Sequence, residues 1–456
     1  MKPIIPILLF LAAAVAGCQK QTDWLDARVN RSTIVPSRLS DYQSMLDADV
    51  MFQNYGYLAR VSSDNYYVTE ADFLSATTDL ERSSCTWAQD VLGTRVPTEW
   101  TRMYLIIATA NICLEGLEKL SAGDGTDIQR KQVKGTALFY RSMAYYNLLQ
   151  HFCQPYDPSS AASLPGVPLR FSADVNERLG RGTIAQVYEE ITGSLEKAIP
   201  LLPANVALKT QPSQNAARVQ LARAYLATEQ WAKAEVISGQ VLADNPVLLD
   251  FKKLNSAASF SFPTFETGNP EVIHYAEGTA VSLMTSNKMI CDPVLFNMYA
   301  GTDLRRTILY RQFNGMPIFK GQYTGRATPF AGIAYNEVYL IHAEACARQG
   351  KTTAAMQTLN QLVATRHSAQ FSPLSAGSAQ EALDKIVSER RKEMPYTGST
   401  SWEDLRRLNR DPRYQRTLTR KIGTATYTLA PGSKRYTFPI PLLEVQLTGI
   451  EQNERP

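Results

Sequence analysis

The stretch that decides the fold is residues 132–158, QVKGTALFYRSMAYYNLLQHFCQPYDP, followed after a polar spacer by residues 164–170, LPGVPLR. Apolar residues recur in the first part at steps of three and four, which predicts a helix. They occupy nearly its whole circumference, so the helix is expected to be buried on several sides. Pro155 and Pro158 cannot continue a helix, and the two prolines of LPGVPLR predict an extended segment after it.

The composition describes an ordinary globular protein. The chain has 456 residues, of which 44% are hydrophobic and 20% are charged. Its net charge of +4, from 47 basic and 43 acidic residues, is small and dispersed. This balance argues against a nucleic-acid partner.

The N-terminus predicts export. Lys2 precedes an apolar run over residues 4–17, which is too short to span a bilayer and ends in Val-Ala-Gly-Cys at residues 15–18. This ending resembles a bacterial lipobox, which implies a signal peptide over residues 1–17, a lipidated Cys18 and a polar tether over residues 18–36. The alternative is an ordinary secretory peptide with a chance cysteine.

The other cysteines do not suggest a disulfide framework. Five remain after Cys18, which is an odd number at wide spacings. Cys113 and Cys346 lie in apolar helical stretches, where a core position is expected.

A helical scaffold is predicted over residues 99–250 and 331–410. Thr183 with Gln186 has the spacing of a capping box, so a helix is expected from there to about Leu201. A hidden repeat follows, in which small and apolar residues recur at an offset of 121 and match the pattern of tetratricopeptide helix pairs. The matching positions are Ala222, Ala224, Leu226, Ala234, Val241 and Leu242 with Ala343, Ala345, Ala347, Ala355, Leu362 and Val363.

Two segments interrupt the helical pattern. Residues 50–98 mix aromatic and polar side chains without a clean period, and residues 251–330 are rich in glycine, proline, serine and aromatics. Both are expected to form loops and short elements. Loops on a rigid scaffold commonly carry binding sites, so the ligand is expected on this side.

The order of several motifs is similar to that of the SusD/RagB family. The resemblance covers essentially the whole mature chain, with Ser401 where the family has an arginine before Trp402. The matching residues are Trp100, Tyr104, Ile107, Ala110 and Asn111; Gly135, Ala137, Arg141, Ala144, Tyr146 and Leu149; Gly166, Val167, Pro168 and Leu169; Arg181, Thr183, Val187, Tyr188 and Ile191; Glu389, Arg390, Arg391 and Glu393; Trp402, Asp404, Leu405 and Arg407; Pro439, Ile440, Pro441, Gln452 and Asn453.

This resemblance implies one mainly α-helical SusD-like domain over residues 37–456, with loop-rich insertions that carry the ligand site. It implies a lipoprotein anchored at the surface of the outer membrane. Such a protein binds a nutrient, a glycan or an oligopeptide, and delivers it to a SusC-like TonB-dependent β-barrel. Two alternatives stay open: a lipid-anchored repeat adaptor that binds only proteins, and a surface hydrolase.

No catalytic or metal-binding motif is recognisable in the sequence. We therefore expect that the protein is not an enzyme and that it binds no cofactor and no metal ion. The four histidines form no HExxH motif, and no nucleophile elbow or phosphate-binding glycine loop occurs. Glu389, Glu393 and Asp404 belong to a charged helical face, for which solvated ion pairs are the default interpretation.

The ligand-binding residues are expected in the two irregular segments. Trp87 precedes the first strong scaffold helix and could offer its indole face to a sugar ring or an apolar side chain. The alternative is that Trp87 fills a gap between loops and scaffold. The full candidate set is Asp64, Asn65, Tyr66, Tyr67 and Trp87, with Tyr275, Tyr299 and Tyr323 as an opposing wall.

Overall fold

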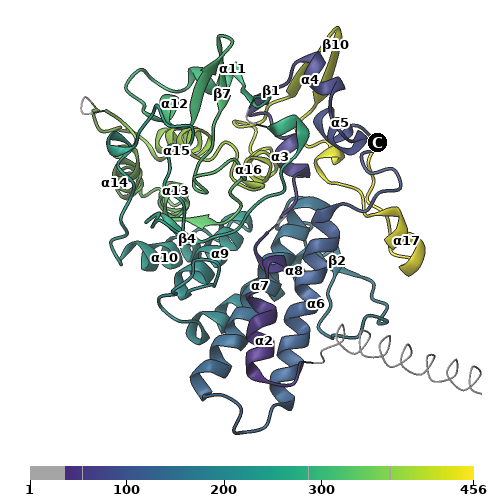
Figure 1. Cartoon of the computed structure of the whole chain (residues 1–456). Coiled ribbons are helices and arrows are strands. Elements are labelled where there is room, and N and C mark those ends of the chain that lie inside the picture. The colour runs from purple at the N-terminus through teal and green to yellow at the C-terminus, as the bar shows by residue number, and fades with distance from the viewer. Residues whose placement is uncertain (1–35, 54, 286, 369–370) are drawn as a thin grey trace, which may run out of the picture.

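The chain folds into a mainly α-helical molecule, shown in Figure 1. This computed structural model describes residues 36–456 except 54, 286, 369 and 370. Cys18 and the expected signal peptide therefore lie outside the described residues. The scaffold helices are α6 (Thr98–Lys119), α7 (Asp127–Phe152), α8 (Ile184–Ala198), α9 (Gln214–Ala227), α10 (Trp231–Leu242), α13 (Tyr335–Arg348), α14 (Thr352–Val363), α15 (Ala379–Glu393) and α16 (Thr400–Leu408).

Helix α7 is the buried helix that the sequence predicts. Thr126 caps its start in a capping box with Gln129, and Cys153 is already extended, ahead of the two prolines. The helix packs between α6 and α8. A Cβ atom at Gly135 would lie 2.9 Å from the Cβ atom of Leu201, so this close approach requires a glycine.

The extended segment after α7 is confirmed as a strand. β2 (Pro165–Pro168) pairs antiparallel with β3 (Arg181–Thr183). Thr183 then caps α8 in the predicted capping box with Gln186, and a 3₁₀ turn, η2 (Ile199–Leu201), ends the helix.

The predicted repeat is confirmed in the helix bounds. The hairpin α9–α10 and the hairpin α13–α14 begin and end at positions that differ by 121 throughout. Their turns also have the same backbone: Gln230 and Lys351 share φ and ψ, and Glu229 and Gly350 both have positive φ. The two hairpins are therefore copies of one unit, separated by the irregular segment.

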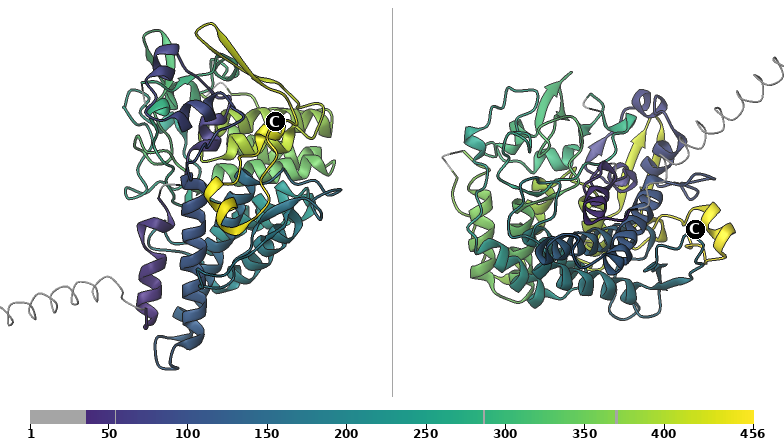
Figure 2. Two further views of the ribbon diagram at one scale, coloured as in Figure 1. Left: turned by 90° about the vertical axis from the view of Figure 1, so that its right-hand side faces the viewer. Right: turned by 60° about the horizontal axis from the view of Figure 1, so that its bottom comes forward.

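The scaffold helices form one continuous array. Neighbours along it are α6, α7, α8, α9, α10, α13, α14 and α15, and α2 (Leu39–Leu46) lies against α6 and α7. Figure 2 shows the array on one side of the molecule and the shorter elements on the other. None of the helices in the described part of the chain is both long and apolar enough to cross a membrane.

The two irregular segments meet in a small sheet. Its strands are β1 (Tyr66–Tyr67), β5 (Ile290–Cys291), β7 (Met316–Phe319) and β6 (Tyr310–Phe313), in that order and antiparallel. β4 (Val272–His274) pairs with β8 (Ile333–Ala334) beside it. The short helical elements are η1 (Asp49–Met51), α3 (Leu58–Ser62), α4 (Glu70–Leu74), α5 (Asp79–Cys85), η3 (Phe251–Lys253), η4 (Ser282–Met284), α11 (Pro293–Asn297) and α12 (Arg305–Ile308).

The C-terminal segment returns to the end of α7. It contains the hairpin β9 (Leu418–Ile422) and β10 (Ala425–Leu429), the turn η5 (Lys434–Tyr436) and α17 (Leu442–Thr448). Asn453 donates hydrogen bonds to the carbonyl oxygens of Phe152 and Phe438. The closing motif thus fastens the chain end to the scaffold.

Candidate functional site

Trp87 belongs to the core. It is 1% exposed, and its indole N–H donates to the carbonyl oxygen of Ser62 over 2.8 Å. The sequence left two interpretations of Trp87 open, a ligand contact or a side chain that fills a gap between loops and scaffold. Its burial agrees with the second, and it comes from partners that are distant in the chain. The guanidinium of Arg420, on β9, lies 5.0 Å from the centre of the indole ring and 4.6 Å from that of Tyr66.

The other candidate aromatics are buried too, except one. Tyr66, Tyr275, Tyr299 and Tyr323 are each at most 2% exposed, whereas Tyr67 is 40% exposed. In the structure the four buried rings present no face to solvent. They pack in the core beneath the irregular segments, where Tyr323 donates to Glu271 and Tyr299 to the carbonyl oxygen of Lys392.

Asp64 and Asn65 border a cavity of about 600 Å³, which we call the α15–α16 cavity. It lies between α15, α16 and the connection that follows α16, and Asp64 and Asn65 close it from the N-terminal segment. Its charged lining consists of Arg390, Arg391, Arg407, Arg413 and Arg416 with Asp64, Asp384 and Asp404. Its apolar lining consists of Met298, Val387, Met394, Leu405 and Leu408.

One side of the α15–α16 cavity is held by ion pairs. Arg391 and Arg416 both bind the carboxylate of Asp64, at 3.1 and 2.9 Å. Asn65 is fixed beside it, because its amide donates to Ser401 Oγ and to the carbonyl oxygen of Pro395. The guanidinium groups are thus positioned before any ligand arrives.

An aromatic ring and a small side chain complete the cavity. Tyr414 donates its hydroxyl hydrogen to Asp384 over 2.7 Å, which fixes the ring on one wall. Ser401 borders the cavity, and α16 is intact with a serine there. An arginine at position 401 would occupy part of this space. The arrangement combines planar polar groups with an apolar wall, as small-molecule sites do.

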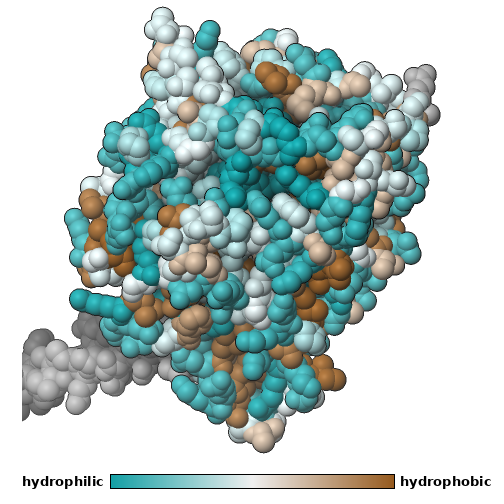
Figure 3. Space-filling model, turned by 180° about the vertical axis from the view of Figure 1, so that it is seen from behind, coloured by the Kyte–Doolittle hydropathy of each residue, from teal (hydrophilic) through white to brown (hydrophobic). Residues whose placement is uncertain are grey.

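A second cavity, of about 530 Å³, adjoins the first along the scaffold. The two share Gln380, Arg407 and Arg413, and the second also reaches Trp231 and Arg410. The scaffold helices lie toward the face seen in Figure 3, where strongly hydrophilic residues gather around a hollow in the upper half.

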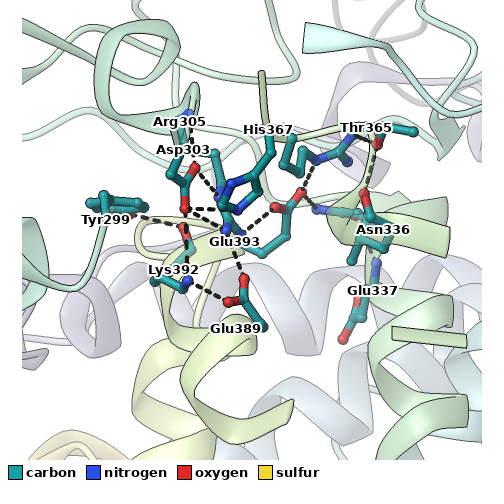
Figure 4. Close-up of polar contacts among 12 residues, drawn as sticks. Tyr299, Asp303, Arg305, Asn336, Glu337, Thr365, His367, Glu389, Lys392 and Glu393 are labelled. Atoms are coloured by element: carbon teal, nitrogen blue, oxygen red, sulfur yellow. Dashed lines mark hydrogen bonds and ion pairs between the residues drawn. The ribbon is translucent and has the colours of Figure 1, made fainter. Parts of the chain in front are cut away.

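The charged face of α15 is not solvated, which corrects the expectation from sequence. Glu389 and Glu393 are 5% and 3% exposed, and Arg305 lies between them and Asp303 (Figure 4). Arg366, itself 0% exposed, joins Glu393 to Glu271. The carboxylates can be buried because two cations pair with them: Arg305 from the irregular segment and Arg366 from the residues that follow α14. This buried ion-pair network connects the irregular segment of residues 251–330, which we call the central segment, to the scaffold helices.

A neighbouring ion pair makes stability depend on pH. Burial by itself would raise the pKa of Glu344, but the guanidinium of Arg407, bonded to both of its oxygens, lowers this pKa to about 2. The ordinary value is 4.5. The carboxylate therefore stabilises the fold above its ordinary pKa, and this contribution is lost as the pH falls toward about 2.

We expect Glu344→Gln to lower the free energy of unfolding at neutral pH and to lower it much less in acid. Urea unfolding of both proteins at several pH values measures this difference. A penalty that stays constant down to about pH 3 would contradict the assigned pKa. Other buried carboxylates titrate in both proteins, so their effects cancel in the comparison.

The sequence reasoning missed most residues of the α15–α16 cavity. Arg391 stands in a run of charges on a helix, which is typical of a solvated surface, and Arg416 and Tyr414 lie in a connection without a motif. One signal was present: Ser401 departs from the family pattern, and it lies at the cavity wall.

Comparisons with known proteins agree with this architecture. A family model described as "Starch-binding associating with outer membrane" matches residues 23–226, and one described as "SusD family" matches residues 320–454. No match is found among curated proteins.

Solved structures show the same fold. A SusD superfamily protein from Bacteroides thetaiotaomicron is 20% identical, with a TM-score of 0.74 over 92% of this chain and 100% of its own. A SusD-like carbohydrate-binding protein from Bacteroides vulgatus is 19% identical, with a TM-score of 0.69 over 91% and 97%. A laminarin-binding SusD-like protein is 17% identical, with a TM-score of 0.65 over 92% and 99%. The solved structures thus show the fold, and the two family models, which match residues 23–226 and 320–454, show the family: the chain belongs to SusD/RagB.

Proposed function

We propose that this protein is a surface lipoprotein that captures a glycan and delivers it to a SusC-like TonB-dependent β-barrel in the outer membrane. The observation that carries the proposal is the family membership over both halves of the chain. Two of the similar structures are described as binding carbohydrate or laminarin, which favours a glycan over a peptide. The proposed mechanism is capture and transfer, without chemistry.

The α15–α16 cavity is the proposed ligand site. Arginine, aspartate and glutamine side chains can exchange several hydrogen bonds with vicinal hydroxyl groups. The apolar wall and the ring of Tyr414 can receive the less polar face of a sugar ring. Because the side chains of a preformed site are already ordered, ordering them costs little free energy when the ligand binds.

The proposed anchor is Cys18. A single acyl chain gives only marginal membrane binding, whereas several give stable attachment. We expect Cys18→Ala to remove the protein from the outer-membrane fraction and to change the mass of the chain. Cell fractionation with mass spectrometry measures both. A Cys18→Ala protein that stays in the outer membrane at unchanged mass would refute the anchor.

The proposed partner is tested by extraction of native membranes in a mild detergent, followed by affinity capture of this protein. We expect a large β-barrel protein to be captured with it in near-equal amount. A stable complex of this kind should bury more than the roughly 1,600 Å² of a standard interface. Full recovery of the protein without any barrel would contradict the delivery step.

A further inference from the structure

A third cavity, of about 430 Å³, lies in the central irregular segment, residues 251–330, and its charged lining residues in the described part of the chain are all cations. Its lining residues all fall between Ser256 and Lys320, within the segment where the sequence predicts ligand contacts. The charged ones are Arg306, Arg311 and Lys320, and none of the aspartates or glutamates that the structure describes lines it. We call it the cationic pocket.

The three cations of the cationic pocket lack counter-ions. None of them forms an ion pair with a carboxylate in the described part of the chain. The contrast with the preceding residue is direct, because Arg305 binds three carboxylates. Within the described residues, the positive charge of the pocket is therefore not compensated by a carboxylate.

Lys320 is the buried cation of this pocket. It follows β7, is 3% exposed, and its ammonium donates to the carbonyl oxygens of Ser256 and Ala258 over 2.6 and 3.2 Å. An ammonium has three N–H donors, so one remains. Burial, and then the charge of Arg311, lower the pKa of Lys320. Burying an unpaired charge costs free energy, which an anion in the pocket would recover.

The two arginines are held in place by aromatic rings. The guanidinium of Arg306 lies 4.4 Å from the ring centre of Phe296, and that of Arg311 lies 5.4 Å from that of Phe313. Arg311 also donates to Asn287 over 2.7 Å. The rings and strand β6 therefore hold these two cations at the pocket without neutralising them.

We propose that the cationic pocket binds an anionic substituent of a glycan, either the carboxylate of a uronic acid or a sulfate ester. That the ligand is a glycan rests on the proposed function. That it carries an anionic group rests on the pocket alone. Both substituents offer the oxygen acceptors that one ammonium and two guanidinium groups bind best. The hydroxyl groups of Ser256, Ser259 and Thr307 line the same space and suit the rest of the sugar.

The test is calorimetric titration of the mature chain with an oligogalacturonate, a chondroitin sulfate oligosaccharide, a neutral laminarin oligosaccharide, inorganic sulfate and a polyglutamate peptide. We expect at least one acidic glycan to bind tighter than the neutral one, with an affinity that falls as salt rises. Lys320→Met and the exposed Arg306→Gln should each weaken it about tenfold or more. The control is Arg326→Gln, which removes a cation from an exposed ion pair in the same segment and should leave the affinity for the acidic glycan unchanged.

The possible results of this titration distinguish failure of the anion-binding proposal from failure of the proposed function. If the acidic glycans bind no tighter than the neutral one, or Arg306→Gln leaves their affinity unchanged in a folded protein, the proposal is overturned. Polyglutamate binding as tightly as the acidic glycans would overturn the assignment to a glycan. If inorganic sulfate binds and responds to Lys320→Met while no glycan of either charge binds, the anion pocket stands and the proposed function fails.

Discussion

Replacing Arg305 with methionine is expected to lower the free energy of unfolding by about 3–5 kcal/mol, the cost of removing one partner from a buried ion pair. Arg305 is 1% exposed and binds Asp303, Glu389 and Glu393 at 2.6 to 3.0 Å. Methionine fills much of the same volume but leaves three carboxylates buried beside one another. Because Asp303 comes from the central segment and the two glutamates come from α15, the loss also loosens that segment from the scaffold.

The pH dependence of this variant supplies an independent check. In the wild type, burial raises the pKa of Asp303, but Arg305 outweighs it and lowers this pKa, so acid removes stability. Without the guanidinium, burial and mutual repulsion should raise the pKa values of Asp303 and Glu389, so mild acid should restore part of the loss. The matched control is Arg326→Met, which breaks an exposed pair with Glu266 and should cost about 0–1 kcal/mol. Equal losses for the two variants in urea unfolding would contradict the network.

Replacing Trp87 with alanine is expected to lower the free energy of unfolding by about 3–5 kcal/mol. The indole fills the space around Arg420, and its N–H satisfies the carbonyl oxygen of Ser62. The positive φ of Trp87 does not offset this cost, since alanine disfavours the conformation as tryptophan does. Thermal unfolding measures the effect. Affinity for any glycan that binds the wild type should stay unchanged at a temperature where the variant is folded.

Trp87→Phe separates the ring from its hydrogen bond. Phenylalanine keeps one aromatic ring beside Arg420 and loses the indole N–H together with the second ring, so it should cost less than alanine. A Trp87→Ala protein with an unchanged melting temperature and a weakened glycan affinity would return Trp87 to the ligand site.

Local and periodic features of the fold were predictable from the chain because their causes lie within a few residues. Thr183 and Gln186 form the predicted capping box, since both partners sit in one turn. The repeat at an offset of 121 was visible because each copy needs small residues where two helices touch. Pro155 and Pro158 indicated the end of α7 through their missing N–H groups.

Features that depend on distant partners were not predictable. Whether Trp87 faces solvent is decided by Arg420, more than 300 residues away in the chain. Whether Glu393 is solvated is decided by Arg305 and Arg366, which reach it from other segments. A run of charged residues on a helix has the same sequence pattern whether its side chains are solvated or buried in ion pairs. The α15–α16 cavity likewise joins Asp64 to Arg391 and Arg416, and no spacing in the sequence relates these positions.

The most direct test of the central claim, that this protein captures a glycan in the α15–α16 cavity, is an equilibrium titration of the mature chain with a panel of glycans. Arg391→Gln and Tyr414→Ala are titrated alongside it, with Arg326→Gln as the control. We predict that at least one glycan binds saturably and is recovered unchanged, and that both cavity variants weaken it about tenfold or more while the control does not. A glycan that binds the wild type and both cavity variants equally, or one that is cleaved on binding, would contradict the account.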